Sequence, residues 1–158
     1  MSVEELDLSC ADDDPDMGIP AGGFWCEDPD KETQAEIEKV KESVKKINLE
    51  NQGELKTVPH VIASCANLEE LNLAYTGITE IPEFVFRLPK LRSLSYNSCY
   101  DLKEHPANCA DAKNLEQLKL DIWEKKTLPK GITELPSLKI LEINGDCVFE
   151  SLPGNVGD

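Results

Sequence analysis

Residues 128–138 are Leu128-Pro129-Lys130-Gly131-Ile132-Thr133-Glu134-Leu135-Pro136-Ser137-Leu138, and the apolar and proline positions of this segment return along the chain. The same order of residue types ends each time in a Leu-x-x-Leu-x-Leu pattern. These patterns begin at Val44, Leu68, Leu91, Leu115 and Leu138, which are 24, 23, 24 and 23 residues apart. The proline positions are Pro59, Pro82, Pro106, Pro129 and Pro153. So many aligned columns indicate an internal repeat.

The residue types of one repeat predict its shape. Alternation of apolar and polar residues with period two predicts a short strand that turns one face inward. Proline ends regular pairing and turns the chain onto the outer side of the coil. A single coil of this length buries too few apolar side chains to offset the ordering of its backbone. Neighbouring coils must therefore stack, and their strands pair into one parallel sheet.

The repeat resembles the leucine-rich repeat family, in its form with 23–24 residues and a Leu-Pro-x-x-Ile segment, over about residues 44–156. The resemblance implies an α/β leucine-rich-repeat solenoid with a short parallel concave β-sheet and an irregular or 3-10 convex side. It is specific for the fold and says almost nothing about the ligand.

The chain before the repeats has two expected parts. We expect an acidic and partly irregular segment over residues 1–30, an N-terminal capping helix over 31–43, and a five-repeat solenoid over 44–158. Ile37, Val40, Val44 and Ile47 follow one another at helical spacing, which favours an amphipathic cap. A weak copy of the strand pattern around Leu6 leaves an additional N-terminal strand open.

The charge of the chain excludes some classes of partner. The 158 residues carry a formal net charge of −15, and the first 30 contain ten acids without a Lys or Arg. Binding of nucleic acid needs clustered basic residues, so we expect no nucleic-acid partner. No run of 18 apolar residues occurs, so we expect no contact with a membrane. The acidic segment is interpreted as a solvated tail, with attraction of a basic partner as the alternative.

The sequence offers no constellation of catalytic residues. His60 and His105 occupy positions of the repeat where a structural role is expected, and no metal, phosphate or nucleophile motif appears. The acidic run Asp12–Asp16 lacks the glycine and glutamate that a calcium loop requires. We therefore expect no enzyme activity, no cofactor and no metal.

The six cysteines fit a reduced protein. Cys65 and Cys109 stand in apolar columns and are expected to be buried. Cys99 and Cys147 follow a strand, where the resembled family places side chains that bond the backbone of the neighbouring coil. Reduced thiols indicate a cytoplasmic protein, and a bridge between Cys10 and Cys26 stays open.

The function that this pattern favours is a non-enzymatic protein–protein interaction module that presents a concave polar sheet with an aromatic rim. Residues between the inward leucines face the concave side, and aromatic residues just beyond the strands can anchor an interface or pack between turns. The expected partner-binding residues are Asn72, Tyr75, Ser95, Asn97, Tyr100, Gln117, Lys119, Asp121, Trp123, Ile140 and Glu142. Two alternatives are an acidic, charge-driven binder, chaperone or decoy for basic proteins, and the recognition part of a larger effector or ligase system.

The last coil is expected to have one apolar side uncovered. An open strand edge is an association hazard, so the pattern predicts a homodimer through the uncapped C-terminal coil. Local fraying, or a fold-back around Asn155, is the alternative. The expected edge residues are Leu141, Ile143, Phe149, Leu152 and Val156.

Overall fold

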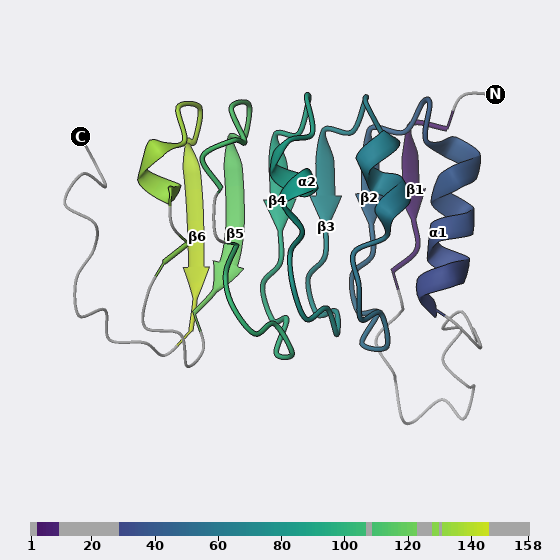
Figure 1. Cartoon of the computed structure of the whole chain (residues 1–158), viewed down its shortest axis with the longest axis horizontal. Coiled ribbons are helices and arrows are strands. Elements are labelled where there is room, and N and C mark those ends of the chain that lie inside the picture. Colours follow the sequence, from purple (N-terminus) through teal and green to yellow (C-terminus); the bar gives the residue numbers. More distant parts are fainter. Residues whose placement is uncertain (1–2, 10–28, 107–108, 123–127, 130, 146–158) are drawn as a thin grey trace.

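The computed structural model describes residues 3–9, 29–106, 109–122, 128–129 and 131–145. Six strands form one parallel sheet in the order of the sequence, with one strand in each coil (Figure 1). The strands are β1 (Glu5–Asp7), β2 (Lys46–Asn48), β3 (Glu70–Asn72), β4 (Ser93–Ser95), β5 (Gln117–Asp121) and β6 (Ile140–Asn144). This arrangement is an α/β solenoid.

In the described residues, a helix lies in four of the five connections between successive strands. Two of these helices begin directly after a proline, because its fixed φ suits the first residue of a turn: Pro59 precedes η1 and Pro82 precedes α2. The helices are α1 (Pro29–Val40), η1 (His60–Ser64), α2 (Glu83–Phe86) and η2 (Ile132–Glu134). In the described part of the chain, no helix is long and apolar enough to cross a bilayer.

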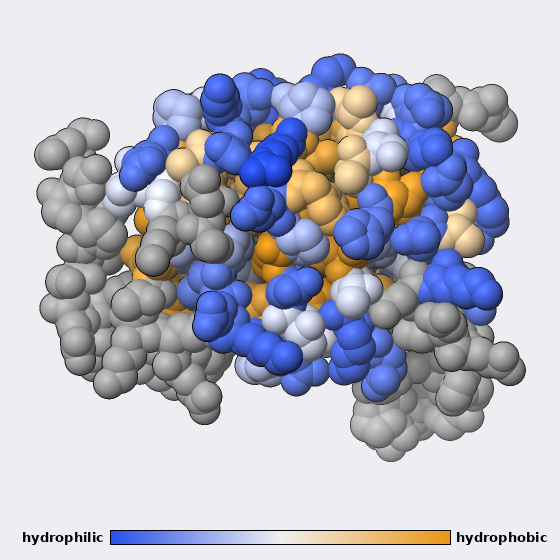
Figure 2. Space-filling view, viewed as in Figure 1, coloured by the Kyte–Doolittle hydropathy of each residue, from blue (hydrophilic) through white to orange (hydrophobic). Residues whose placement is uncertain are grey.

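The core is a ladder of apolar side chains that runs through all six strands. The register pairs Leu6, Ile47, Leu71, Leu94, Leu118 and Leu141 one after another. The four inner members are at most 2% exposed, whereas the first and last are partly buried. Figure 2 shows hydrophilic residues over much of the visible surface, with apolar residues between them. The continuous inner ladder that the repeat predicts is confirmed.

The sheet starts earlier than the sequence predicts. The expected solenoid begins at residue 44, but β1 pairs with β2 in parallel, so the sheet begins at Glu5. The Ser43 hydroxyl donates to the Val3 carbonyl at 2.9 Å and fixes this first strand. Helix α1 begins before the expected residue 31 and ends before residue 43. Its Ile37 is fully buried, and the helix packs against η1.

Polar side chains also join neighbouring coils. In three coils the residue just before the first leucine of the repeat donates to a backbone carbonyl of the preceding coil. These bonds run from Asn67 Nδ2 to Glu42 (3.0 Å), from Asn114 Nδ2 to Pro89 (2.7 Å) and from Ser137 Oγ to Lys113 (2.8 Å). The corresponding signal in the sequence is a column of mostly short polar residues: Ser43, Asn67, Lys90, Asn114 and Ser137.

Among the described residues, Cys65, Cys99 and Cys109 are buried and form no disulfide, and burial is what the columns of Cys65 and Cys109 predict. The Cys99 thiol donates to the Leu73 carbonyl of the preceding coil at 3.1 Å, in the role expected for this column. Cys10, Cys26 and Cys147 lie outside the described residues.

Candidate functional site

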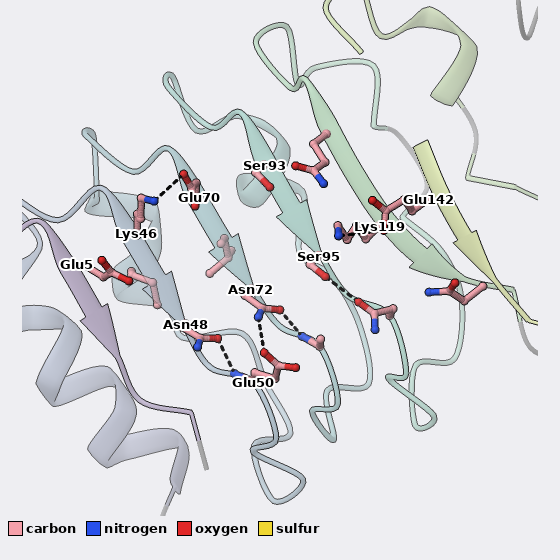
Figure 3. A pocket seen from close by; sticks show the side chains of 16 residues that line it. Glu5, Lys46, Asn48, Glu50, Glu70, Asn72, Ser93, Ser95, Lys119 and Glu142 are labelled. Atoms are coloured by element: carbon pink, nitrogen blue, oxygen red, sulfur yellow. Dashed lines mark hydrogen bonds and ion pairs between the residues drawn. The ribbon is translucent and has the colours of Figure 1, made fainter. Parts of the chain in front are cut away.

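The outer face of the sheet forms a groove of about 550 Å³ (Figure 3). We call it the sheet groove; it is lined by the outward side chains of β1 to β6 and the residues after them, from Glu5 to Asn144. Because side chains alternate along a strand, the inward leucines and this polar lining come from the same short segments. The sheet groove lies on the face that the sequence predicts as the binding face.

Two ion pairs cross the sheet groove. The Lys46 ammonium lies 3.1 Å from the Glu70 carboxylate, and the Lys119 ammonium lies 2.9 Å from Glu142. The hydrogen bond to Glu70 raises the pKa of Lys46 above its ordinary value. All four side chains are well exposed, so these pairs contribute little to stability. Both lysines of the sheet groove are thus already paired with carboxylates.

At the N-terminal end of the sheet groove, short polar side chains fix the ends of the strands. The Asn48 side-chain oxygen accepts from the Glu50 backbone N–H at 3.2 Å, and Asn72 accepts in the same way from Ala74 at 3.0 Å. The Asn72 amide then donates to the Glu50 carboxylate at 2.9 Å. Such local bonds stabilise a turn in place of a ladder bond. Much of the hydrogen-bonding capacity at this end is therefore used inside the protein.

At the C-terminal end, the polar side chains are less engaged. Within the described ranges, Ser93, Gln117 and Asn144 make no side-chain hydrogen bond. Asn97 accepts from the Ser95 hydroxyl at 2.7 Å, and its amide group has no acceptor among the described residues. An amide side chain can both donate and accept. The unused capacity of the sheet groove is therefore concentrated on β4 to β6.

The structure brings six of the expected partner-binding residues together. These line the sheet groove: Asn72, Ser95, Asn97, Gln117, Lys119 and Glu142. Tyr75, Tyr100 and Ile140 lie outside the lining but are exposed by 47%, 71% and 47% respectively. Trp123 lies outside the described residues.

Asp121 does not line the sheet groove, and its role in binding a partner stays a prediction. It is buried, and its carboxylate accepts hydrogen bonds from the backbone N–H and, at 3.2 Å, from the hydroxyl of Ser98. In the two preceding coils the equivalent N–H groups, of Asn51 and Tyr75, donate to backbone carbonyls instead. The Asp121 side chain takes the place of that carbonyl and joins β5 to the turn after β4.

The expected self-association edge is described only in part. Leu141 and Ile143 are partly buried, although their counterparts in inner strands are buried. Phe149, Leu152 and Val156 lie outside the described residues. Pairing with a second copy therefore stays a prediction.

The two histidines lie apart from the sheet groove. His60 belongs to η1, and its ring centroid lies 5.5 Å from that of Phe84. The His105 ring lies 6.1 Å from the Tyr96 ring, whose hydroxyl is buried. No group of three or more residues suited to hold a metal ion occurs among the described residues.

Comparison with known proteins gives a distant structural similarity. No protein-family model matches the chain, and no curated protein matches it. Among solved structures, the chain is similar to a leucine-rich-repeat protein of Leptospira interrogans, with 23% sequence identity and a TM-score of 0.39. The match covers 69% of this chain and 34% of that protein, so the chain spans about a third of its length.

Proposed function

We propose that the chain is a leucine-rich-repeat protein that binds another protein or peptide through the sheet groove and catalyses no reaction. The aligned repeat columns and the in-register parallel strands support the repeat type. Helix α1, with Ile37 buried, serves as the N-terminal cap of the core. Cys65, Cys99 and Cys109 form no disulfide, which supports a cytoplasmic location, where thiols stay reduced.

The observation that carries this proposal is the unused hydrogen-bonding capacity on β4 to β6. The Gln117 and Asn144 amides can each bond an N–H and a C=O group, which are the two groups that a peptide main chain offers. The rigid sheet holds these side chains at fixed spacing, which lowers the entropy lost on binding. A polar open face also suits a protein partner better than a cofactor, because cofactor sites are mostly apolar.

Site-directed photo-crosslinking tests the proposal. A photo-reactive amino acid replaces Gln117 in one variant and Glu80, an exposed residue outside the sheet groove, in the control. In a lysate of the source cells, we expect a discrete crosslinked partner at position 117 that is absent at position 80. Equal products at both positions, or products at position 80 alone, would contradict binding through the sheet groove.

A second candidate function is charge-driven binding of basic proteins. The net charge of −15 and the ten acids of residues 1–30 favour it. Changing Asp12, Asp13, Asp14 and Asp16 to Asn removes charge without altering the sequence of β1. If the sheet groove binds, this variant keeps its partner and moderate salt has a small effect. If charge dominates, the variant loses binding and the wild type loses it between low and moderate salt.

A further inference from the structure

Strand β6 ends at Asn144, and Gly145 follows it directly. Asparagine is a thermolabile residue, because the backbone nitrogen of the following residue can attack its side-chain carbonyl carbon and form a cyclic imide. The attack is favoured where the following residue has no side chain, where its N–H makes no hydrogen bond, and where the asparagine amide is exposed. The surroundings of Asn144 can be compared with each of these conditions.

Two of the conditions are met by the residues themselves. The φ angle of Gly145 is 128°, which side chains rarely tolerate, so the backbone favours glycine at this place. Asn144 and Gly145 are both exposed. The Asn144 amide makes no hydrogen bond to the described residues. The side-chain carbonyl carbon of Asn144 is therefore accessible to the nitrogen of Gly145.

The backbone N–H of Gly145 meets the remaining condition, because Gly145 lies in the last coil that the structure describes. In the four preceding coils the N–H at the same position of the repeat donates to an acceptor of the next coil. These donors are Asn51, Tyr75, Ser98 and Ile122. The Gly145 N–H has no acceptor among the described residues. Its nitrogen is therefore available for the attack.

Other asparagines of the chain are protected by the same kind of bond. Asn97 stands in the column of Asn144, but the N–H of the following Ser98 donates to the buried Asp121 carboxylate. Four more are followed by a leucine whose N–H donates to a backbone carbonyl: Asn48, Asn67, Asn72 and Asn114. Among the described asparagines, Asn144 alone combines a following glycine with an unbonded N–H.

We propose that Asn144 is a site of spontaneous deamidation, with water as the co-reactant. The Gly145 nitrogen forms a bond to the Asn144 Cγ, the bond from Cγ to Nδ2 breaks, and the proton of the Gly145 N–H leaves with Nδ2 as ammonia. Water then opens the imide at either of its carbonyls, which gives aspartate or isoaspartate at position 144. This inference goes beyond the proposed function and does not depend on it.

The reaction changes the chemistry of the sheet groove, because Asn144 belongs to its lining. An amide group both donates and accepts hydrogen bonds, whereas a carboxylate only accepts and carries a negative charge. Isoaspartate also lengthens the main chain at the end of β6, where the Asn144 carbonyl accepts from the Ile122 N–H at 3.1 Å. Both products therefore alter the part of the sheet groove whose hydrogen-bonding capacity is unused.

Peptide mapping by tandem mass spectrometry tests the inference on the full chain, incubated at mildly alkaline pH and sampled with time. The same chain unfolded in urea gives the rate without protection by the fold, and an isoaspartyl methyltransferase reports isoaspartate. We expect Asn144 to react in the folded chain within severalfold of its rate in urea. Asn97, the matched internal control, should react many-fold more slowly when folded than in urea.

The products and the pH dependence distinguish the imide route from direct hydrolysis. Both aspartate and isoaspartate should appear at position 144, faster as the pH rises, because the attacking nitrogen must lose its proton. Asn144→Gln should remove the methylation at this position. Three results would each overturn the inference: Asn144 unchanged in the folded chain while it reacts in urea, aspartate without isoaspartate, or equal rates for Asn97 and Asn144 in the folded chain.

Discussion

Replacing Asp121 by alanine should destabilise the fold and leave the binding surface intact. The carboxylate accepts two hydrogen bonds from Ser98, and both residues are at most 9% exposed. A hydrogen bond to a charged group contributes about 1.5–3 kcal/mol, and a buried donor left without its acceptor loses a similar amount. Because the two bonds share one oxygen, we expect a total loss of about 2–4 kcal/mol.

Urea unfolding followed by circular dichroism measures this loss. The change should appear as a lower midpoint with an unchanged slope, and as a melting temperature lower by about 5–15 °C for a chain of this size. Asp121→Asn keeps an oxygen acceptor and should lose about half as much. Asn97→Ala, at the half-buried side chain in the equivalent position of the preceding coil, should lose less than about 1 kcal/mol.

The result that would refute this reasoning is specific. An Asp121→Ala protein as stable as the wild type, which at the same time loses the crosslink at position 117, would show that Asp121 faces the partner. The carboxylate would then belong to the sheet groove, as the sequence pattern predicts. If Asp121→Ala is less stable but keeps the crosslink at position 117, measured at a temperature where the variant is folded, the result supports a structural role for Asp121.

Three further predictions follow from the packing of the coils. Gly77→Ala should lower the free energy of unfolding by about 1–3 kcal/mol, because an added Cβ would lie 2.0 Å from the Gly53 carbonyl oxygen. Gly53→Ala is the control and should be nearly neutral, because a Cβ at residue 53 would have no atom within 4 Å. Equal urea midpoints for the two variants would contradict this prediction. Burial raises the pKa of the Cys65 and Cys109 thiols from 9.0 to about 11. The stability that the neutral thiols contribute is complete below pH about 9 and is lost as the pH rises towards about 11. The melting temperature of the wild type should therefore fall over this range. It should fall less in a Cys65→Ala/Cys109→Ala protein. The partly buried Leu141 and Ile143 of β6 predict a dimer in sedimentation velocity at rising concentration, and a monomer at high micromolar concentration would contradict it.

The ladder of apolar side chains in the core could be predicted because the same apolar position recurs in every repeat. Each inward leucine recurs at a nearly constant distance, so one irregular coil does not disturb the register of the others. Strand β1 has the single inward residue Leu6, Leu8 follows directly after the strand, and both lie far from the first regular repeat. A pattern of two residues is too short to separate a strand from chance. The sequence alone therefore does not decide whether this strand exists, and the pairing with β2 shows that it belongs to the sheet.

Asp121 could not be placed by the same reasoning, because that reasoning assumes equal strands. β2, β3 and β4 each span three residues, but β5 continues through Asp121. Its carboxylate bonds the turn after β4, where the preceding coils use a backbone carbonyl. A repeat alignment gives the column of a residue but not the length of its strand. The side chain that replaces a backbone acceptor is therefore visible only in three dimensions.

Residues at the same position of the repeat also make different contacts in the sheet groove, and these differences locate the candidate site. Asn72 and Lys119 stand in one column, yet the first bonds the turn after its own strand and the second pairs with Glu142 of the neighbouring strand. Asn144 shares a column with the buried Asp121 and keeps its amide unengaged within the described part of the chain. Since the repeat requires only the inward residues, each outward position can either fix its own coil or bind a partner. A partner surface on this fold is therefore recognised where internal side-chain hydrogen bonds become fewer, and in the described residues that change occurs from β4 onward.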